Sequence, residues 1–313
     1  MKTEQKCRHL KFTVNHEDAG LRIDVFLAGK YQVISRAVIQ KLIKQGSVKY
    51  NTEPCLEQKM RVAEGSEVEF DIPDDPEILY PKPENIPIEQ LYEDDDILII
   101  NKSPDIVIHP GDGCSEGTLV NALLSRYDGF ADNFINHIRP GIVHRLDKET
   151  SGCLIIARNQ EALHTLSIAF RKHEPEKTYL AVVAGHFNEK SGTVNRKIGR
   201  HPVSRKKMSV LENAGKDAVT HYKVVKEGLF QELPVSLLEV KIETGRTHQI
   251  RVHMSYLHHP VLGDKVYGGA KRFDLPRQML HAWKLKINHP STGEKMEFTA
   301  QVPDDMRNII DVM

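Results

Sequence analysis

A charged segment between two apolar segments is the feature that most constrains the fold of this chain. Residues 144–152 read His-Arg-Leu-Asp-Lys-Glu-Thr-Ser-Gly, and apolar residues flank them at 141–143 and 153–157. Short apolar runs bounded by turn-forming residues are typical of strands that are buried in a sheet. The sequence therefore predicts a charged loop held between two buried strands.

Further strand-like runs predict that this loop belongs to a large sheet. These runs are residues 97–100, 179–184, 219–225, 236–242 and 296–300. Several of them alternate between apolar and polar residues, as half-buried antiparallel strands do. Helical spacing of apolar residues appears over 163–170 and 250–257, which is too infrequent for repeating βαβ units. We therefore expect an α+β fold on a mixed, largely antiparallel sheet.

Length and composition predict two domains. A chain of 313 residues with 40% hydrophobic residues can bury a full core and exceeds the usual size of one domain. A proline-rich acidic stretch at 73–87 fits neither a helix nor a central strand, and we expect it to be a linker. The predicted domains are a small α+β domain at 15–72 and a larger domain at 88–313.

Composition is that of an ordinary globular protein. No run approaches the roughly 18 apolar residues of a membrane span, and the first residues lack the apolar core of a signal peptide. We therefore expect a cytoplasmic protein, with a monomer as the default state. The four cysteines form no Cys-x-x-Cys pair, and the histidines match no metal-binding motif. The sequence predicts reduced, structural cysteines and no metal site.

Net charge is zero, with 43 basic and 43 acidic residues, so only local clusters of charge can indicate a partner. The first cluster lies on a helix expected between Ser35, a plausible cap, and Gly46, a plausible stop. One face of this helix is apolar, and the other carries Arg36, Lys41 and Lys44. Such a face is often only solvated surface, but it also suits contacts with RNA phosphates.

The second basic cluster occupies residues 196–207, with six basic and no acidic residues. Glycine and proline within it disfavour a helix, so we expect a positively charged loop. Arg200 and Arg205 in this loop are candidates for RNA phosphate contacts. A flexible loop that serves only solubility is the alternative.

Asp147 is the candidate for chemistry within the charged loop. The basic residues around it, His144, Arg145 and Lys148, favour an ionised carboxylate that is directed at a ligand. An aspartate of this kind is most often part of a loop salt bridge. The loop by itself leaves both interpretations open.

A second polar segment, residues 243–253, supplies a partner for a carboxylate. The chain is expected to turn at Gly245 and enter a helix in which His248 and Arg251 share one face. Arg251 would project from a rigid element, where its planar guanidinium can hold a carboxylate or a phosphate. A structural salt bridge is the alternative.

The charged loop resembles a known signature. The pattern His-Arg-Leu-Asp-x-x-Thr-Ser-Gly is similar to the signature of RluA-type RNA pseudouridine synthases. Blocks at 93–110, 177–185, 244–253, 259–268 and 278–290 agree with that family in order and spacing, so the resemblance spans about residues 88–305. Residues 20–72 resemble the small RNA-binding domain shared by a ribosomal small-subunit protein and tyrosyl-tRNA synthetases. The chain looks most like the branch that modifies large-subunit ribosomal RNA.

The resemblance implies an isomerase that breaks the C1′–N1 bond of uridine, turns the base and rejoins it through C5, without metal or cofactor. Asp147 would attack the anomeric carbon or remove a sugar proton, and both routes stay open. Arg251 would hold Asp147, while Tyr179 would stack on the flipped base and could handle a proton. Arg145 would fill the position that the base leaves. The same match assigns substrate or RNA contacts to Ile250, Lys177 and His144.

One residue departs from the family pattern. The family usually has Asn-Lys-Pro-x-Gly after the first strand, whereas this chain reads Asn-Lys-Ser-Pro-Asp, ending at Asp105. A non-glycine residue is expected to strain or reshape that turn. The departure lies far in sequence from Asp147, so it concerns the turn more than the activity.

Two alternative functions belong to other classes. An inactive RNA-binding or ribosome-assembly factor would have lost a key residue, but Asp147, Tyr179 and Arg251 are all present. A glycosidase or nucleosidase usually needs two carboxylates, and Glu149 is the nearest second candidate in the sequence. The isomerase is therefore the favoured prediction.

Overall fold

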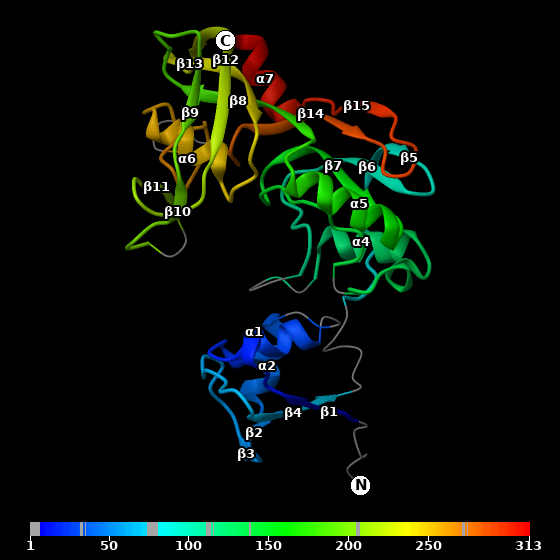
Figure 1. The fold of residues 1–313 in the computed structure, drawn as a ribbon. Helices are drawn as coiled ribbons and strands as arrows, with labels where there is room; N and C mark the ends of the chain where they lie inside the picture. The colour runs from blue at the N-terminus through cyan, green and yellow to red at the C-terminus, as the bar shows by residue number, and fades with distance from the viewer. Residues whose placement is uncertain are drawn as a thin grey trace. The chain divides into compact units, whose positions relative to one another are not determined.

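The computed structural model describes residues 7–31, 34, 36–73, 81–110, 114, 116–137, 139–204, 207–270, 273 and 275–313. Contacts divide the chain into two units (Figure 1). Unit 1 comprises Met1–Ile86 and Val107–Pro140, and unit 2 comprises Pro87–Ile106 and Gly141–Met313. The predicted cap Ser35, the candidate Arg205 and residues 74–80 of the expected linker lie outside the described residues.

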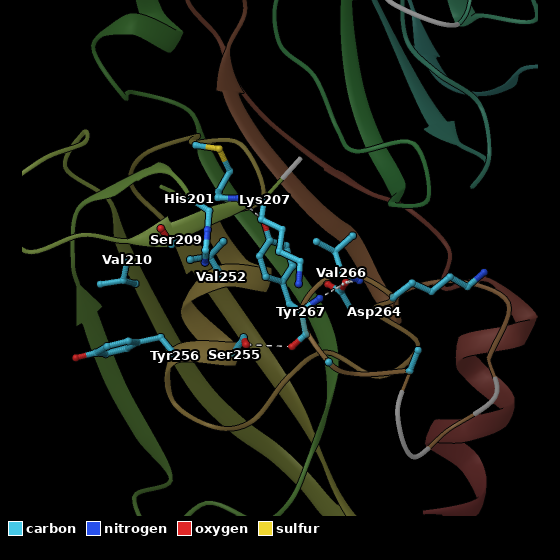
Figure 2. Close-up of a pocket in the computed structure, with 14 residues that line it drawn as sticks. His201, Lys207, Ser209, Val210, Val252, Ser255, Tyr256, Asp264, Val266 and Tyr267 are labelled. Carbon is cyan, nitrogen blue, oxygen red and sulfur yellow. Dashed lines mark hydrogen bonds between the residues drawn. The ribbon is translucent and has the colours of Figure 1, made fainter. Parts of the chain in front are cut away.

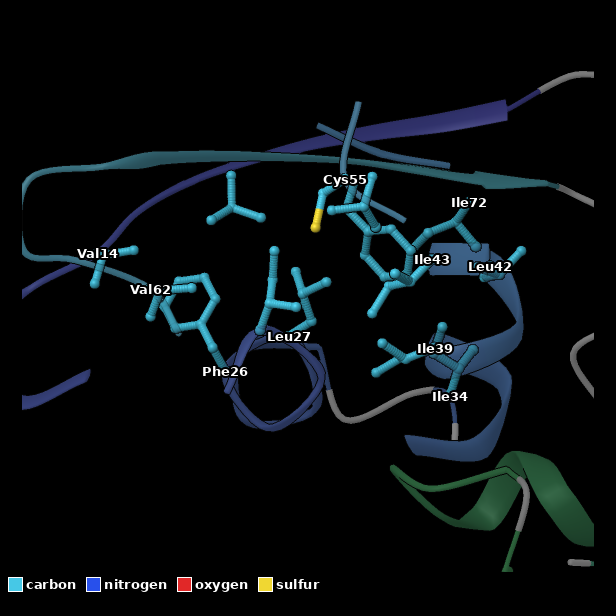
Figure 3. Packing of buried hydrophobic residues seen from close by; sticks show 14 residues of the cluster. Val14, Phe26, Leu27, Ile34, Ile39, Leu42, Ile43, Cys55, Val62 and Ile72 are labelled. Carbon is cyan, nitrogen blue, oxygen red and sulfur yellow. The ribbon is translucent and has the colours of Figure 1, made fainter. Parts of the chain in front are cut away.

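The N-terminal part of unit 1 contains a small antiparallel sheet and two α-helices. The strands lie in the order β1 (Cys7–Thr13), β4 (Glu67–Pro73), β2 (Val48–Tyr50) and β3 (Glu53–Pro54). A 3-10 helix, η1 (His16–Asp18), precedes α1 (Ile23–Lys30) and α2 (Arg36–Lys44). Apolar side chains of both helices, including Phe26, Leu27 and Leu42, pack beneath the sheet (Figure 3). This cluster is the hydrophobic core of the small domain.

Helix α2 confirms the predicted helix with one apolar and one basic face. Ile39, Leu42 and Ile43 are fully buried, while Lys41 and Lys44 are exposed. Gly46 follows the helix with φ +84°, a left-handed conformation that glycine adopts without strain and that commonly ends helices.

Arg36 does not lie free on the basic face. Its Nε and Nη2 donate to Asp24 Oδ2 at 3.0 and 2.9 Å, and Arg22 binds the same carboxylate with two further hydrogen bonds. Asp24 is fully buried, so this ion pair fastens the start of α2 to α1. Arg36 therefore stabilises the fold of unit 1, and an RNA contact by it stays a prediction.

The remaining described elements of unit 1 are helix α4 (Leu119–Arg126) and the 3-10 helix η2 (Phe130–Asn133). A capping box begins α4: the Thr118 hydroxyl accepts from the Asn121 backbone, and the Asn121 side chain accepts from the Thr118 backbone.

Unit 2 is built on a nine-stranded sheet. Its main path runs β5 (Glu89–Glu93), β6 (Ile97–Lys102), β7 (Ser151–Ala157), β14 (Leu280–Asn288), β8 (Glu176–Ala184), β13 (Leu233–Ile242), β12 (Val219–Phe230) and β9 (Ser191–Asn195), and β15 (Lys295–Thr299) pairs with β14. Within this sheet β7 and β14 pair in parallel, and the other pairs are antiparallel. The prediction of a mixed, largely antiparallel sheet is confirmed.

The helices of unit 2 are α5 (Gln160–Arg171), α6 (Gln249–Tyr256) and α7 (Asp304–Val312). A separate two-stranded hairpin is formed by β10 (Ile198–Arg200) and β11 (Met208–Val210). The first two helices coincide with the predicted helical patterns. Within the described part of the chain, no helix is long and apolar enough to cross a membrane.

Three local predictions are wrong. Residues 141–143 do not form a strand: Gly141 has φ +69°, and Ile142 makes one isolated bridge to Ile156. The basic segment is not entirely a loop, because 198–200 pair with 208–210. His248 does not lie inside the helix with Arg251; it precedes α6 in a left-handed conformation with φ +57°.

Candidate active site

The loop that carries Asp147 is positioned where β7 and β14 run side by side. The Thr150 N–H donates to the Asp147 carbonyl at 3.1 Å, which closes a turn immediately before β7. Gly152 has φ +114°, and a side chain there would place its Cβ 2.2 Å from the Ala282 carbonyl oxygen. The glycine that ends the sequence signature is therefore required by the close approach of β14, and this approach fixes the loop.

Lys102, at the end of β6, holds the same loop from inside the protein. Its Nζ donates to the carbonyls of Ser103, Ile106 and Lys148 at 2.7, 3.1 and 2.9 Å, and the residue is only 2% exposed. Burial and the nearby Arg277 lower the pKa of Lys102 to about 7, against the opposing effect of Asp105 and Asp147. The sequence did not assign this role.

Asp105 occupies the turn that follows Lys102. Its φ is +68°, the left-handed region in which the family's usual glycine would be unstrained. Aspartate is one of the few other residues that adopt this region. Asp105 therefore forms a left-handed turn at this position, and Lys102 reaches the Lys148 carbonyl.

Asp147 is bound by Arg251, which also binds a second carboxylate. Arg251 Nη1 donates to Asp147 Oδ2 at 2.8 Å, and its Nε and Nη2 donate to Asp264 at 2.7 and 3.0 Å. Asp264 is fully buried, and Arg251 is 5% exposed. Burial by itself lowers the pKa of Arg251, but the hydrogen bonds and charges of Asp264 and Asp147 outweigh this and raise it. Arg251 is thus a rigid cation that orients one oxygen of Asp147.

Asp264 has no free oxygen for acid or base chemistry. Besides its two bonds from Arg251, its Oδ1 accepts from the backbone N–H groups of Val266 and Tyr267 at 2.8 and 3.0 Å. Among the described residues that line the Asp147 pocket, Asp147 is the carboxylate and Glu149 does not appear, whereas glycosidases use a separated pair of carboxylates. This geometry weighs against the glycosidase alternative.

The other oxygen of Asp147 faces His248. His248 Nε2 lies 3.9 Å from Asp147 Oδ1, and His248 Nδ1 forms a 2.8 Å hydrogen bond with the Tyr267 hydroxyl. Burial lowers the pKa of His248, although the charge of Asp147 acts in the opposite direction. A neutral imidazole at this distance leaves Asp147 Oδ1 available to a substrate.

A pocket of about 70 Å³ brings the predicted catalytic residues together. Asp147, Tyr179, Ile250 and Arg251 line it, with Arg145 also in its wall. Tyr179 is 8% exposed, and burial together with the charge of Asp147 raises its pKa, so its hydroxyl is protonated at neutral pH. The residues that sequence reasoning placed at the site thus converge from the Asp147 loop, β8 and α6.

Two predicted contact residues lie elsewhere, in a cluster around Phe170 of α5. The His144 ring stacks on Phe170 with centroids 4.6 Å apart, and its Nε2 accepts from the Ile155 N–H at 3.3 Å. Burial and the charge of Lys177 lower the pKa of His144 to about 3. Lys177 is buried rather than solvated, with Nζ 5.9 Å from the Phe170 ring centre. Both residues support the sheet, and direct RNA contacts by them stay predictions.

The predicted phosphate contacts outside the pocket lie on exposed surfaces. Arg200 is exposed at the end of β10, and Lys41 and Lys44 are exposed on α2 of the other unit. The structure adds Arg246 to the pocket wall, where its Nε donates to the Asp217 carbonyl at 2.9 Å. Arg246 follows Gly245 in the polar segment 243–253, and this position is the signal that could have identified it from the sequence.

The fold thus carries a pocket in which one carboxylate is held by a buried arginine and shares the lining with a tyrosine. The family model for RNA pseudouridylate synthase matches residues 96–256, and the S4 domain model matches residues 21–68. The chain belongs to the RNA pseudouridine synthase family.

Individual relatives agree with this assignment. The chain is 42% identical over 310 residues to an uncharacterized RNA pseudouridine synthase of Aquifex aeolicus, covering 96% of this chain and 95% of the relative. It is 41% identical over 319 residues to ribosomal large subunit pseudouridine synthase D of Salmonella typhimurium, with coverage of 97% and 94%. Human RNA Pseudouridylate Synthase Domain Containing 1 matches with a TM-score of 0.57 and 33% identity, covering 69% of this chain and 83% of that chain. The protein is therefore an RNA pseudouridine synthase with an N-terminal S4 domain.

Proposed function

We propose that this enzyme converts uridine to pseudouridine in large-subunit ribosomal RNA and that Asp147 performs the chemistry. The observation that carries the proposal is the chain of contacts from Asp264 through Arg251 to Asp147, beside Tyr179 in one pocket. The names of the Salmonella typhimurium relative and of its Escherichia coli counterpart, 40% identical, support the substrate. We assign residues 15–72 to the RNA-binding domain, 73–87 to the linker and 88–313 to the catalytic domain, and expect a cytoplasmic monomer.

The reaction is an isomerisation in which one glycosidic bond replaces another. The C1′–N1 bond breaks and its electron pair leaves with the uracil, which turns in the pocket so that C5 faces C1′. In one route an oxygen of Asp147 displaces N1 from C1′ and is later displaced by C5. In the other, Asp147 removes the 2′ proton as a glycal forms, and it returns that proton to C2′ when C5 bonds to C1′. C5 then bonds to C1′, the C5 proton is lost, and N1 gains a proton. No atom is added or removed overall.

The orientation of the Asp147 carboxylate suits both nucleophilic attack on C1′ and removal of the 2′ proton. Arg251 binds Oδ2 at 2.8 Å, so the carboxylate cannot rotate freely, while Oδ1 points to the neutral His248. Holding a reacting group in its productive orientation removes much of the entropic barrier of the step. The buried guanidinium also places a positive charge beside the carboxylate.

The base is held by residues on two sides of the pocket. The Tyr179 ring and the buried Ile250 supply apolar surfaces against which a uracil can pack. The raised pKa of Tyr179 favours stacking and hydrogen-bond donation by its hydroxyl over action as a base. Arg145 is exposed at the edge of the pocket, where it can enter the space in the RNA that the flipped uridine leaves.

The substrate is tested with transcripts of large-subunit and small-subunit ribosomal RNA, which contain no pseudouridine. After incubation with the purified full chain, pseudouridines are mapped by carbodiimide treatment and reverse transcription. We expect discrete modified positions in the large-subunit transcript and none in the small-subunit transcript. Modification of the small-subunit transcript would refute the substrate, and unmodified transcripts of both kinds would refute the activity.

A further inference from the structure

A second and larger pocket lies in unit 2 next to the active site. It has a volume of about 650 Å³ and is formed by the β10–β11 hairpin, the end of α6 and the segment around Tyr267 (Figure 2). We call it the hairpin pocket and define it by Lys207, Val210, Tyr256, Lys265 and Tyr267. Its lining residues Asp264 and Tyr267 contact Arg251 and His248 of the active site, but this pocket is distinct from the one that Asp147 lines.

The hairpin pocket is positively charged. Lys207 and Lys265 line it and are exposed, and His201 lines it as well. Asp264 is the carboxylate among the described lining residues, but it is fully buried and both of its oxygens are bound by Arg251. Asp264 is thus turned toward Arg251 and away from solvent, which leaves the exposed lysines as the charges that a ligand meets, and an anion is the ligand that this pocket favours.

An exposed aromatic ring lies at the edge of the pocket. Tyr256, the last residue of α6, is 45% exposed, and the Arg196 guanidinium lies 6.0 Å from its ring centre. Cationic side chains combined with an accessible aromatic ring are the features with which proteins bind single-stranded nucleic acid. Val210 and Val252 provide additional apolar surface.

The wall between the two pockets is Tyr267. Its hydroxyl accepts from the Met208 N–H of β11 at 2.9 Å and bonds to His248 Nδ1 at 2.8 Å. The Arg251 guanidinium lies 5.2 Å from the centre of its ring. His248 and Arg251 also contact Asp147. Tyr267 therefore separates a ligand in the hairpin pocket from the two residues next to the catalytic carboxylate.

We propose that the hairpin pocket binds a single-stranded segment of the RNA substrate next to the target uridine. Lys207 and Lys265 bind its phosphates, and a base stacks on Tyr256. This inference rests on the proposed function, because it assumes that the flipped uridine occupies the Asp147 pocket. It adds a second RNA-binding site that selects substrates with unpaired nucleotides beside the target, since a duplex cannot present a base to Tyr256.

The test compares four variants of the full chain on a large-subunit RNA transcript. Tyr256→Ala removes the ring, whereas Tyr256→Phe keeps it; Lys207→Gln removes a charge in the pocket, whereas Lys223→Gln removes an exposed charge on β12. Tritium release from transcripts labelled at uridine C5 gives kcat and KM, because the C5 proton is lost in the reaction. Wild-type release in the same assay verifies the proposed function separately.

We expect Tyr256→Ala and Lys207→Gln each to raise KM about tenfold, in line with the loss of one stacked base or one phosphate contact. Tyr256→Phe and Lys223→Gln are expected to stay within about twofold of wild type, a range set by the small effect of surface charge changes. A transcript containing 4-thiouridine is expected to form photo-crosslinks to the peptide that carries Tyr256. Equal KM values for Tyr256→Ala and Tyr256→Phe, or crosslinks confined to the Asp147 pocket while wild-type release is normal, would overturn the inference.

Discussion

Replacing Asp264 with asparagine tests whether the buried carboxylate is needed to hold Arg251 in place. The change removes a negative charge from two hydrogen bonds of 2.7 and 3.0 Å in a site where Asp264 is fully buried. Breaking a buried ion pair typically costs about 3–5 kcal/mol, and because an amide oxygen remains to accept from Arg251, we expect a cost of about 3 kcal/mol. For a unit of this size we expect the melting temperature to fall by roughly 6–12 °C.

The same substitution is expected to lower activity more than substrate binding. Without Asp264, Arg251 is free to shift toward Asp147, and a misplacement of roughly 1 Å reduces rates by about 100-fold. Tritium release under saturating RNA measures kcat, and filter binding measures the affinity for RNA. We expect kcat of Asp264→Asn to fall about 100-fold while the affinity stays within about twofold of wild type.

Asp24→Asn is the matched control, because Asp24 is also fully buried and binds Arg22 through two hydrogen bonds, but lies in unit 1. It is expected to lower stability and weaken RNA binding without a comparable loss of kcat. If folded Asp264→Asn retains the kcat of wild type, the argument that Arg251 orients Asp147 through Asp264 is refuted.

Three further predictions concern the loop, the core and the basic helix. Gly152→Ala is expected to lower stability by about 2–4 kcal/mol and to reduce activity, because its Cβ would lie against the backbone of β14; urea unfolding and tritium release measure both effects. Burial lowers the pKa of His281 to about 4, so between pH 6.5 and 4 the unfolded state binds a proton more readily than the folded state, and the free energy of unfolding falls as the pH falls. At pH 5 this residue alone lowers the free energy of unfolding by about 2 kcal/mol. The stability of His281→Gln, measured by urea unfolding, should therefore depend less steeply on pH. Changing Lys41 and Lys44 together to glutamine is expected to lower the slope of log affinity against log salt by about 1.5, and an unchanged slope would remove this helix face from the RNA interface.

The sequence predicted those parts of the fold that depend on local pattern. The apolar runs identified β6 and β8, and the spacing of Ile39, Leu42 and Ile43 identified α2. The strand expected at 141–143 failed because three apolar residues are too few to distinguish a strand from an extended segment. Gly141 adopts a left-handed conformation there, which local hydrophobicity does not reveal.

The sequence predicted which residues form the candidate site, but it did not predict the hydrogen bonds that hold them in place. Asp147, Tyr179 and Arg251 do line one pocket, yet the roles of Asp264 and Lys102 depend on contacts between segments far apart in the chain. Nothing in the local sequence shows that Asp264 binds Arg251 instead of solvent. For the same reason, the burial of Lys177 beside Phe170 could not be read from its place in a strand.

The central claim is that Asp147 performs the chemistry, and the most direct measurement is single-turnover tritium release by Asp147→Asn. The substitution keeps the size of the side chain and a hydrogen-bond acceptor for Arg251 but removes the nucleophile or base. We predict a rate at least roughly 10³-fold below wild type with RNA affinity largely retained, whereas Glu149→Gln, which changes the other carboxylate of the loop, should stay near the wild-type rate. Tritium release by Asp147→Asn at the wild-type rate would show that another group performs the chemistry.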